Sequence, residues 1–270
     1  MPELQVKVSR SIQEQAANRL WLAYRTAEPC APVRDLLSGG GLETAYAVQE
    51  INTQRRLAEG ARLVGRKVGI TSVATRKQYG ATEPDYGMLF DDMALFDNGE
   101  IPAKKLIHPK VEGEVAFVLG RDIDNVSPTP AELLRAIDFA VAAIEIVDSR
   151  VQNWDNRILD AIADSAGAAM FVLGAQPRRL KDFDLIHCGM VMERGGDPVV
   201  TGTAGNVMGN PLRSALWVAG ASARAGHPLK AGDTILSGAL GPMTPAAPGD
   251  SFEARISGLG LVRVSFAKEE

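Results

Sequence analysis

The hydrophobic pattern changes character about sixty residues into the chain. Over residues 9–28 apolar side chains recur at helical spacing, and residues 43–59 predict a second amphipathic helix. Pro29 and Pro32 should end the first helix, because proline cannot donate the hydrogen bond that a helix interior requires. Beyond Gly60 short apolar runs alternate with glycine, proline and aspartate, which is typical of strands and turns.

The second part of the chain predicts many short strands. Gly195-Gly196-Asp197 has the composition of a hairpin turn between two of them. The predicted strands cover residues 63–71, 112–119, 140–147, 169–173, 188–193, 199–201, 234–237, 251–256 and 261–266.

Two further helices are predicted among these strands, over residues 130–136 and 211–224. The second has proline at its first position and Gly226 just beyond its end, as helices often do. The pattern therefore predicts an α+β fold, with a helical N-terminal region (residues 1–60) capping a strand-rich domain (residues 61–270).

The amino-acid composition excludes several classes of partner and site. Apolar residues make up 46% of the 270 residues, which is enough to build a sizeable core. The net charge of −4 argues against a nucleic-acid partner. Two cysteines and three histidines are too few for a disulfide scaffold or a zinc ribbon. Catalytic side chains are therefore expected mostly among the carboxylates and lysines.

Several familiar signals are absent from the sequence. No window reaches the ~18 apolar residues of a membrane span, and no signal peptide is visible, so we expect a cytoplasmic protein without a membrane partner. Neither a phosphate-binding glycine loop nor a G-x-S-x-G nucleophile motif occurs.

Glu112 and Glu114 are the first candidate site residues. On a strand, alternate side chains share a face, so both glutamates should project together. A solvated face of an antiparallel strand would look similar. However, Ala116 and Val118 continue the same face with apolar side chains, which favours a polar pocket that leads into the core.

Glu145 is the only charged residue between Phe139 and Val147. A carboxylate in such an apolar run should be buried and needs a cation or hydrogen-bond donors. A salt bridge to arginine or lysine would meet that need. If Glu145 instead joins Glu112 and Glu114, the three carboxylates suit a hard divalent cation such as Mg²⁺ or Mn²⁺.

Lys67 and Asp85 are further candidates. Strand alternation places Lys67 beside Gly65 and Gly69, which would leave room for a ligand, although an exposed lysine fits the pattern equally well. Burial and a nearby metal would both lower the pKa of this lysine. Residues 83–87 predict a turn, in which Asp85 is either a turn-forming residue or an acid/base group.

These residues lie in segments that resemble the 2-keto-4-pentenoate (2-hydroxypentadienoate) hydratases of the fumarylacetoacetate hydrolase superfamily. The resemblance begins near Ala45, and its most specific element is the E-x-E pair followed about thirty residues later by a third acid. The matching segments are Gly65-Arg-Lys-Val-Gly-Ile-Thr-Ser72, Glu83-Pro-Asp-Tyr-Gly87, Glu112-Gly-Glu114, Ile144-Glu-Ile-Val-Asp-Ser-Arg150, Asp160-Ala-Ile-Ala-Asp164, Leu236-Ser-Gly-Ala-Leu-Gly-Pro-Met243 and Gly258-Leu-Gly260.

The resemblance implies roles for individual residues. Glu112, Glu114 and Glu145 are expected to bind Mg²⁺ or Mn²⁺, and Lys67 and Asp85 to act as acid/base residues. It also implies a mixed β-roll or β-sandwich body of the fumarylacetoacetate hydrolase C-terminal type, which would make the strand-rich domain the catalytic one.

Substrate contacts are expected from Ser165, Ser237 and Gly238. One departure stands out, because hydratases of this family often have a serine where this chain has Gly167. The assisting role of that serine is therefore in question here.

The implied activity is a metal-dependent hydro-lyase of aromatic catabolism. It would add water to a 2-hydroxy-2,4-dienoate and give a 4-hydroxy-2-oxoacid. The implied assembly is a homo-oligomer, a pentamer or decamer, and an association with a pathway decarboxylase or aldolase is a further expectation.

Three alternatives remain open from the sequence. A 4-oxalocrotonate-type decarboxylase shares the metal site, but such enzymes tend to lack an acid at the position of Asp85. A hydratase of a dicarboxylic homologue, such as 2-oxo-hept-4-ene-1,7-dioate, fits parts of the pattern. A non-catalytic metal-binding or assembly subunit would not need Lys67 and Asp85.

Overall fold

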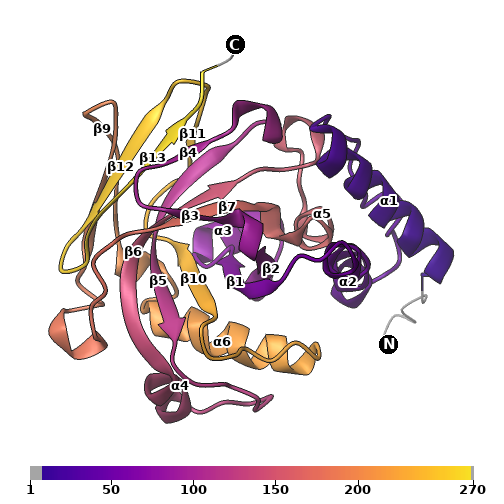
Figure 1. Ribbon diagram of the computed structural model, residues 1–270. Coiled ribbons are helices and arrows are strands. Elements are labelled where there is room, and N and C mark those ends of the chain that lie inside the picture. The colour runs from indigo at the N-terminus through magenta and orange to yellow at the C-terminus, as the bar shows by residue number, and fades with distance from the viewer. Residues whose placement is uncertain (1–7, 269–270) are drawn as a thin grey trace.

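Two long helices form one side of the molecule. A computed structural model describes residues 8–268, and in it α1 (Arg10–Thr26) and α2 (Leu42–Ala58) lie close to their predicted positions. The Ser9 hydroxyl caps the start of α1, and Ala27 ends it in a left-handed conformation before Pro29. Figure 1 shows both helices together with α5 (Ile158–Ala163), beside the sheets.

The N-terminal helices share a core with a later part of the chain. Leu20 of α1 and Val48 of α2 pack in one buried cluster with Val151 and Ile162. Predicted region 1–60 therefore buries its apolar face against the segment around α5. The division of the chain at residue 60 stays a prediction, and residues 1–7 lie outside the described residues.

The larger sheet is mixed and has eight strands. Its order is β2-β1-β10-β5-β6-β7-β3, and β11 pairs with β5. The pairs β1/β10 and β3/β7 are parallel, and the other pairs are antiparallel. The strands are β1 (Leu63–Gly69), β2 (Asp85–Phe90), β3 (Ala94–Phe96), β5 (Lys110–Leu119), β6 (Ile137–Val147), β7 (Ala168–Leu173), β10 (Thr234–Ala239) and β11 (Thr244–Pro245).

A second sheet of five strands lies beside the first (Figure 1). Its strands β12 and β13 contact β6, and the apolar side chains between the sheets form the main core. The predicted hairpin turn is confirmed, since Gly195 and Gly196 adopt positive φ angles of 57° and 96° between β8 and β9. In order, the strands are β4 (Gly99–Ile101), β13 (Gly260–Phe266), β12 (Ser251–Ile256), β8 (Gly189–Arg194) and β9 (Asp197–Thr203).

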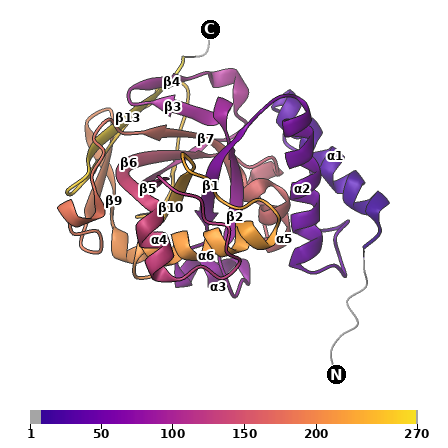
Figure 2. The same ribbon diagram turned by 60° about the horizontal axis from the view of Figure 1, so that its bottom comes forward.

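The remaining helices connect strands of the two sheets. The predictions for α4 (Pro130–Ala136) and α6 (Pro211–Arg224) are confirmed, and α6 packs on β10 and β1 (Figure 2). The sequence analysis missed α3 (Val73–Tyr79) and α5, which span only seven and six residues. Among residues 8–268, none of the helices has both the length and the apolar character that a membrane crossing requires.

The predicted turn at residues 83–87 is wrong beyond Pro84. Asp85 begins strand β2, where it pairs with Gly69 of β1. Gly87 suggested a turn, but a glycine is needed there because the backbone of Ser165 lies very close. A Cβ atom at Gly87 would lie 2.0 Å from the carbonyl oxygen of Ser165. Pairing with β1 therefore overrides the local turn composition.

We expect Asp160 to be the main link between α5 and the N-terminal segment. Its buried carboxylate accepts hydrogen bonds from the backbone amides of Val33, Arg34 and Arg157, and also pairs with the Arg34 guanidinium at 2.7 Å. Asp160→Ala should lower the free energy of unfolding by about 3–5 kcal/mol, because three backbone amides lose their acceptor and each buried amide left without one costs about 1–3 kcal/mol. Urea denaturation measures this change.

Asp155 provides a matched control, because it pairs with the same arginine at 2.6 Å but is exposed. Asp155→Ala should cost about 0–1 kcal/mol. Equal losses for the two variants would contradict the proposed role of Asp160.

Candidate metal centre and active site

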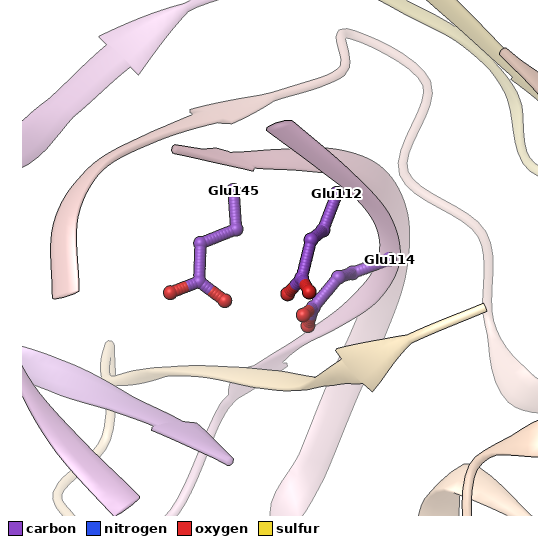
Figure 3. A group of neighbouring side chains, drawn as sticks. All are labelled: Glu112, Glu114 and Glu145. Atoms are coloured by element: carbon purple, nitrogen blue, oxygen red, sulfur yellow. The ribbon is translucent and has the colours of Figure 1, made fainter. Parts of the chain in front are cut away.

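Three glutamates face one another across two neighbouring strands. Glu112 of β5 lies directly opposite Glu145 of β6 in the antiparallel register, and Glu114 follows Glu112 on the same face. Figure 3 shows the three carboxylates pointing into one space. Each carboxylate offers an oxygen that lies within 4.8 Å of those of the other two. The strand alternation and the cross-strand register thus produce the predicted cluster.

These carboxylates have few hydrogen-bond donors of their own. Glu114 and Glu145 are fully buried, and the Gly238 amide donates to one Glu114 oxygen at 2.7 Å. Within residues 8–268, the other Glu114 oxygen and both Glu145 oxygens have no hydrogen-bond partner. Buried carboxylates without donors, and like charges opposite each other on a sheet, are both unfavourable.

The pKa values of these glutamates reflect the same unfavourable burial and charge repulsion. Burial, and next the charge of Glu145, raise the pKa of Glu112 to about 7. Burial and both neighbouring glutamates raise the pKa of Glu114 well above its usual range. A divalent cation would relieve this repulsion, and a set of carboxylate oxygens suits Mg²⁺ or Mn²⁺. The residues present therefore fit the predicted metal.

Lys67 of β1 is buried beside the glutamates. Its ammonium donates to the carbonyl oxygen of Ala166 at 2.8 Å, and lies 3.0 Å from a Glu145 oxygen, at ion-pair distance but without hydrogen-bond alignment. Burial lowers the pKa of Lys67, but the charges of Glu145 and the other carboxylates outweigh burial and raise it. Without a bound metal the carboxylates thus keep the pKa of this lysine above its usual value, and the lowering expected beside a metal stays a prediction.

Asp85 occupies the space above Gly69. A Cβ atom on Gly69 would lie 2.2 Å from a carboxylate oxygen of Asp85, and one on Gly65 would lie 1.9 Å from the carbonyl oxygen of Thr234. The two glycines beside Lys67 therefore make room for protein atoms, whereas the sequence analysis reserved that space for a ligand. Burial, opposed by the charge of Lys67, raises the pKa of Asp85 to about 6.

One cavity brings these groups together. It has a volume of about 1060 Å³, and Lys67, Asp85 and Glu112 lie in its wall. Glu114 and Glu145 are fully buried and do not line the cavity. An anionic ligand in this cavity would meet Glu112 and both candidate acid/base residues.

The three residues that were predicted to contact the substrate lie in three different surroundings. The Ser165 hydroxyl accepts from the Met88 amide, and Ser165 lines a separate, smaller pocket beside Tyr24. Ser237 is buried, and among the described residues its hydroxyl has no partner. Gly238 contacts the site through its amide, which fixes Glu114. Their contacts with substrate remain predictions.

Gly167, the departure noted in the sequence, lies in the cavity wall with a φ angle of 71°. The wall also contains residues that were not predicted to belong to the site. Lys110 could have been found, since it precedes Glu112 by two positions on the same strand. The others carry no sequence signal that marks them. They include Tyr79, Trp154, Asn206, Arg213 and Met243.

Known proteins share this fold and much of this sequence. The model of the fumarylacetoacetate hydrolase C-terminal family matches residues 72–267. The TodF product hydratase of Pseudomonas putida is 55% identical over 99% of this chain and 100% of its own length. The 2-keto-4-pentenoate hydratase of Paraburkholderia xenovorans is 46% identical over 96% of each chain.

A solved structure is similar over nearly the whole chain. The 4-oxalocrotonate decarboxylase of Pseudomonas putida G7, complexed with magnesium and adipate, superposes with a TM-score of 0.92 at 32% identity, covering 96% of this chain and 99% of that one. That neighbour binds magnesium, and the glutamate cluster described above could hold such an ion. On sequence and structure, this chain belongs to the 2-keto-4-pentenoate hydratase family of the fumarylacetoacetate hydrolase superfamily.

Proposed function

We propose that this chain is a hydro-lyase that converts 2-keto-4-pentenoate, in its 2-hydroxy-2,4-dienoate form, into a 4-hydroxy-2-oxoacid during meta-cleavage catabolism of aromatic compounds. The observation that carries the proposal is that Lys67, Asp85 and Glu112 line one cavity and that Glu112 belongs to a cluster of three glutamates. The names of relatives that are 46–55% identical agree with it.

Glu112, Glu114 and Glu145 would hold the metal, Mg²⁺ or Mn²⁺. When bound, the ion supplies Lewis acidity that stabilises negative charge on the 2-oxygen of the substrate. The chain holds the three ligands in place through the β5/β6 register and through the Gly238 amide. These features preorganise the site, so that little rearrangement is needed on binding.

Lys67 and Asp85 would move the protons. In the first step the 2-hydroxyl loses a proton and C5 gains one, giving a 2-oxo-3-enoate. In the second step water adds its oxygen at C4 and a proton at C3. Asp85, with a pKa of about 6, can both accept and donate near neutral pH. The charged Lys67 can orient an oxygen atom of substrate or water, or donate to it.

The alternatives share the fold, so they must be separated by their chemistry. The decarboxylase structure is nearly superposable at 32% identity, and the hydratases are more similar in sequence. Retention of Asp85 favours hydration. Following the dienoate absorbance with Mg²⁺ and identifying the products decides the matter: CO₂ indicates decarboxylation, a hydroxylated product indicates hydration, and no change indicates a non-catalytic subunit. A dicarboxylic hydratase would prefer the longer diacid.

The assembly is proposed to be a homo-oligomer, a pentamer or decamer, in the cytoplasm. Sedimentation equilibrium measures the number of subunits. Co-purification with the pathway decarboxylase or aldolase tests a wider complex.

Glu114→Gln should separate metal binding from fold stability. In the wild type, Mg²⁺ at about 100 times its dissociation constant should add about 2.7 kcal/mol to the free energy of unfolding. The variant should lose most of this gain together with hydratase activity. In chelator it should be at least as stable as the wild type, because one of three repelling carboxylates is gone. Thermal unfolding with and without Mg²⁺ measures both effects.

Glu100→Gln is the control, since Glu100 is exposed on β4. It should behave like the wild type in both conditions. Full activity of Glu114→Gln in chelator-treated buffer would contradict the proposed metal site.

Lys67→Ala should leave Mn²⁺ binding intact and lower turnover by about 10²- to 10⁴-fold, the usual contribution of a positioned proton donor. Calorimetric titration with Mn²⁺ and the dienoate absorbance measure the two effects. Lys181→Ala, at an exposed lysine, controls for the lost charge. An unchanged rate in Lys67→Ala would remove Lys67 from the mechanism.

A further inference from the structure

We propose that Lys110 binds the carboxylate of the substrate in the metal cavity and that Trp154 holds Lys110 in place for this task. The inference rests on the proposed function only for the identity of the substrate. It extends the recognition site beyond the glutamates, Lys67 and Asp85.

Lys110 lies on the same face of β5 as the metal ligands. It precedes Glu112 by two residues and lies opposite Val147 in the β5/β6 register. Both Lys110 and Val147 line the cavity. The lysine side chain is half-buried, and its charge interacts with that of Glu112.

The Lys110 ammonium is held by an aromatic ring. Its nitrogen lies 4.0 Å from the centre of the Trp154 ring, the geometry of a cation–π contact. Among residues 8–268 no hydrogen bond or ion pair to this ammonium occurs, although it carries three donors. The ring thus fixes the position of the charge and leaves its N–H groups available to a ligand.

Trp154 is itself held in an uncommon backbone conformation. Asn153 and Trp154 both have positive φ angles, 56° and 54°, which are rare for a bulky residue such as tryptophan. The indole N–H donates to the carbonyl oxygen of His108 at 3.0 Å. This turn and this hydrogen bond direct the ring toward Lys110, and strain of this kind is common at functional sites.

The other cations of the cavity wall are engaged or exposed. Lys67 contacts Ala166 and Glu145, and Arg76 donates to the carbonyl oxygens of Ile70 and Thr71. Arg213 is exposed. Lys110 is therefore the lining cation that is fixed by a ring and still has its N–H groups available to a ligand, two residues from the candidate metal ligand Glu112.

Binding of pyruvate to the Mg²⁺-loaded protein tests this role without turnover. Pyruvate has the carboxylate and carbonyl of a 2-oxoacid and lacks the tail. Calorimetric titration should show about ten- to a hundred-fold weaker binding to Lys110→Met, the loss expected for one charge-assisted hydrogen bond. Lys110→Arg should keep most of the affinity, and Lys181→Met, at an exposed lysine, should bind like the wild type.

Mn²⁺ binding is measured on the same variants. Lys110→Met should bind Mn²⁺ as tightly as the wild type or more tightly, because it removes a positive charge near the site. Pyruvate affinity that is unchanged in Lys110→Met would overturn the proposal. A loss of pyruvate affinity that merely follows a loss of Mn²⁺ would do so as well.

A double-mutant cycle tests the role of Trp154 as a positioning residue. Trp154→Leu should weaken pyruvate binding, and Trp154→Phe, which keeps a ring, should restore much of it. The double variant Lys110→Met/Trp154→Leu should bind no more weakly than Lys110→Met alone, because the ring acts through the lysine. Additive losses would overturn the positioning role.

Kinetic measurements then show which end of the substrate Lys110 binds. With 2-hydroxy-2,4-pentadienoate, Lys110→Met should raise KM and change kcat much less. An effect confined to a dicarboxylic substrate would mean that Lys110 binds a second carboxylate, which overturns the proposal. A wild type that binds pyruvate through Lys110 but hydrates no dienoate would refute the proposed function and leave this inference standing.

Discussion

The repulsion among three buried carboxylates is the constraint around which this structure is organised. Glu112 and Glu145 are direct neighbours across β5 and β6, and Glu114 lies beside them in the core. A sheet would be more stable with apolar side chains at these positions. The fold maintains the cluster because the surrounding β-strands fix the register, and the two sheets together bury more than enough apolar surface elsewhere.

Few positive charges in the cavity oppose the negative charges of these carboxylates. Four carboxylates, those of the cluster and Asp85, act on the single buried ammonium of Lys67. A divalent ion would remove most of the remaining negative charge, after which an anionic substrate could enter. Lys110 lies just outside this group and is fixed by Trp154. With a metal bound, this arrangement would allow a chain with a net charge of −4 to accept an anion.

The parts of the structure that follow from local patterns were predictable. Strand alternation places Glu112 and Glu114 on one face, and proline and glycine mark the ends of α6. Long-range pairing was not predictable from such patterns. Asp85 looked like a turn residue until β1 provided a partner strand, and the spaces above Gly65 and Gly69 are filled by segments that are distant in sequence. Trp154 has no periodic signal, because a strained turn places it.

A similar fold that holds such a carboxylate cluster does not by itself identify the reaction. The decarboxylase structure superposes with a TM-score of 0.92, so the sheets and the helices serve enzymes of more than one chemistry. A metal ion held by the cluster would stabilise negative charge on the 2-oxygen, a need common to hydration and decarboxylation. The choice between them must then depend on the groups that deliver protons and on the cavity wall beyond the metal. In the mechanism proposed for this chain, the groups that move protons are Lys67 and Asp85, and the wall beyond the metal includes Gly167.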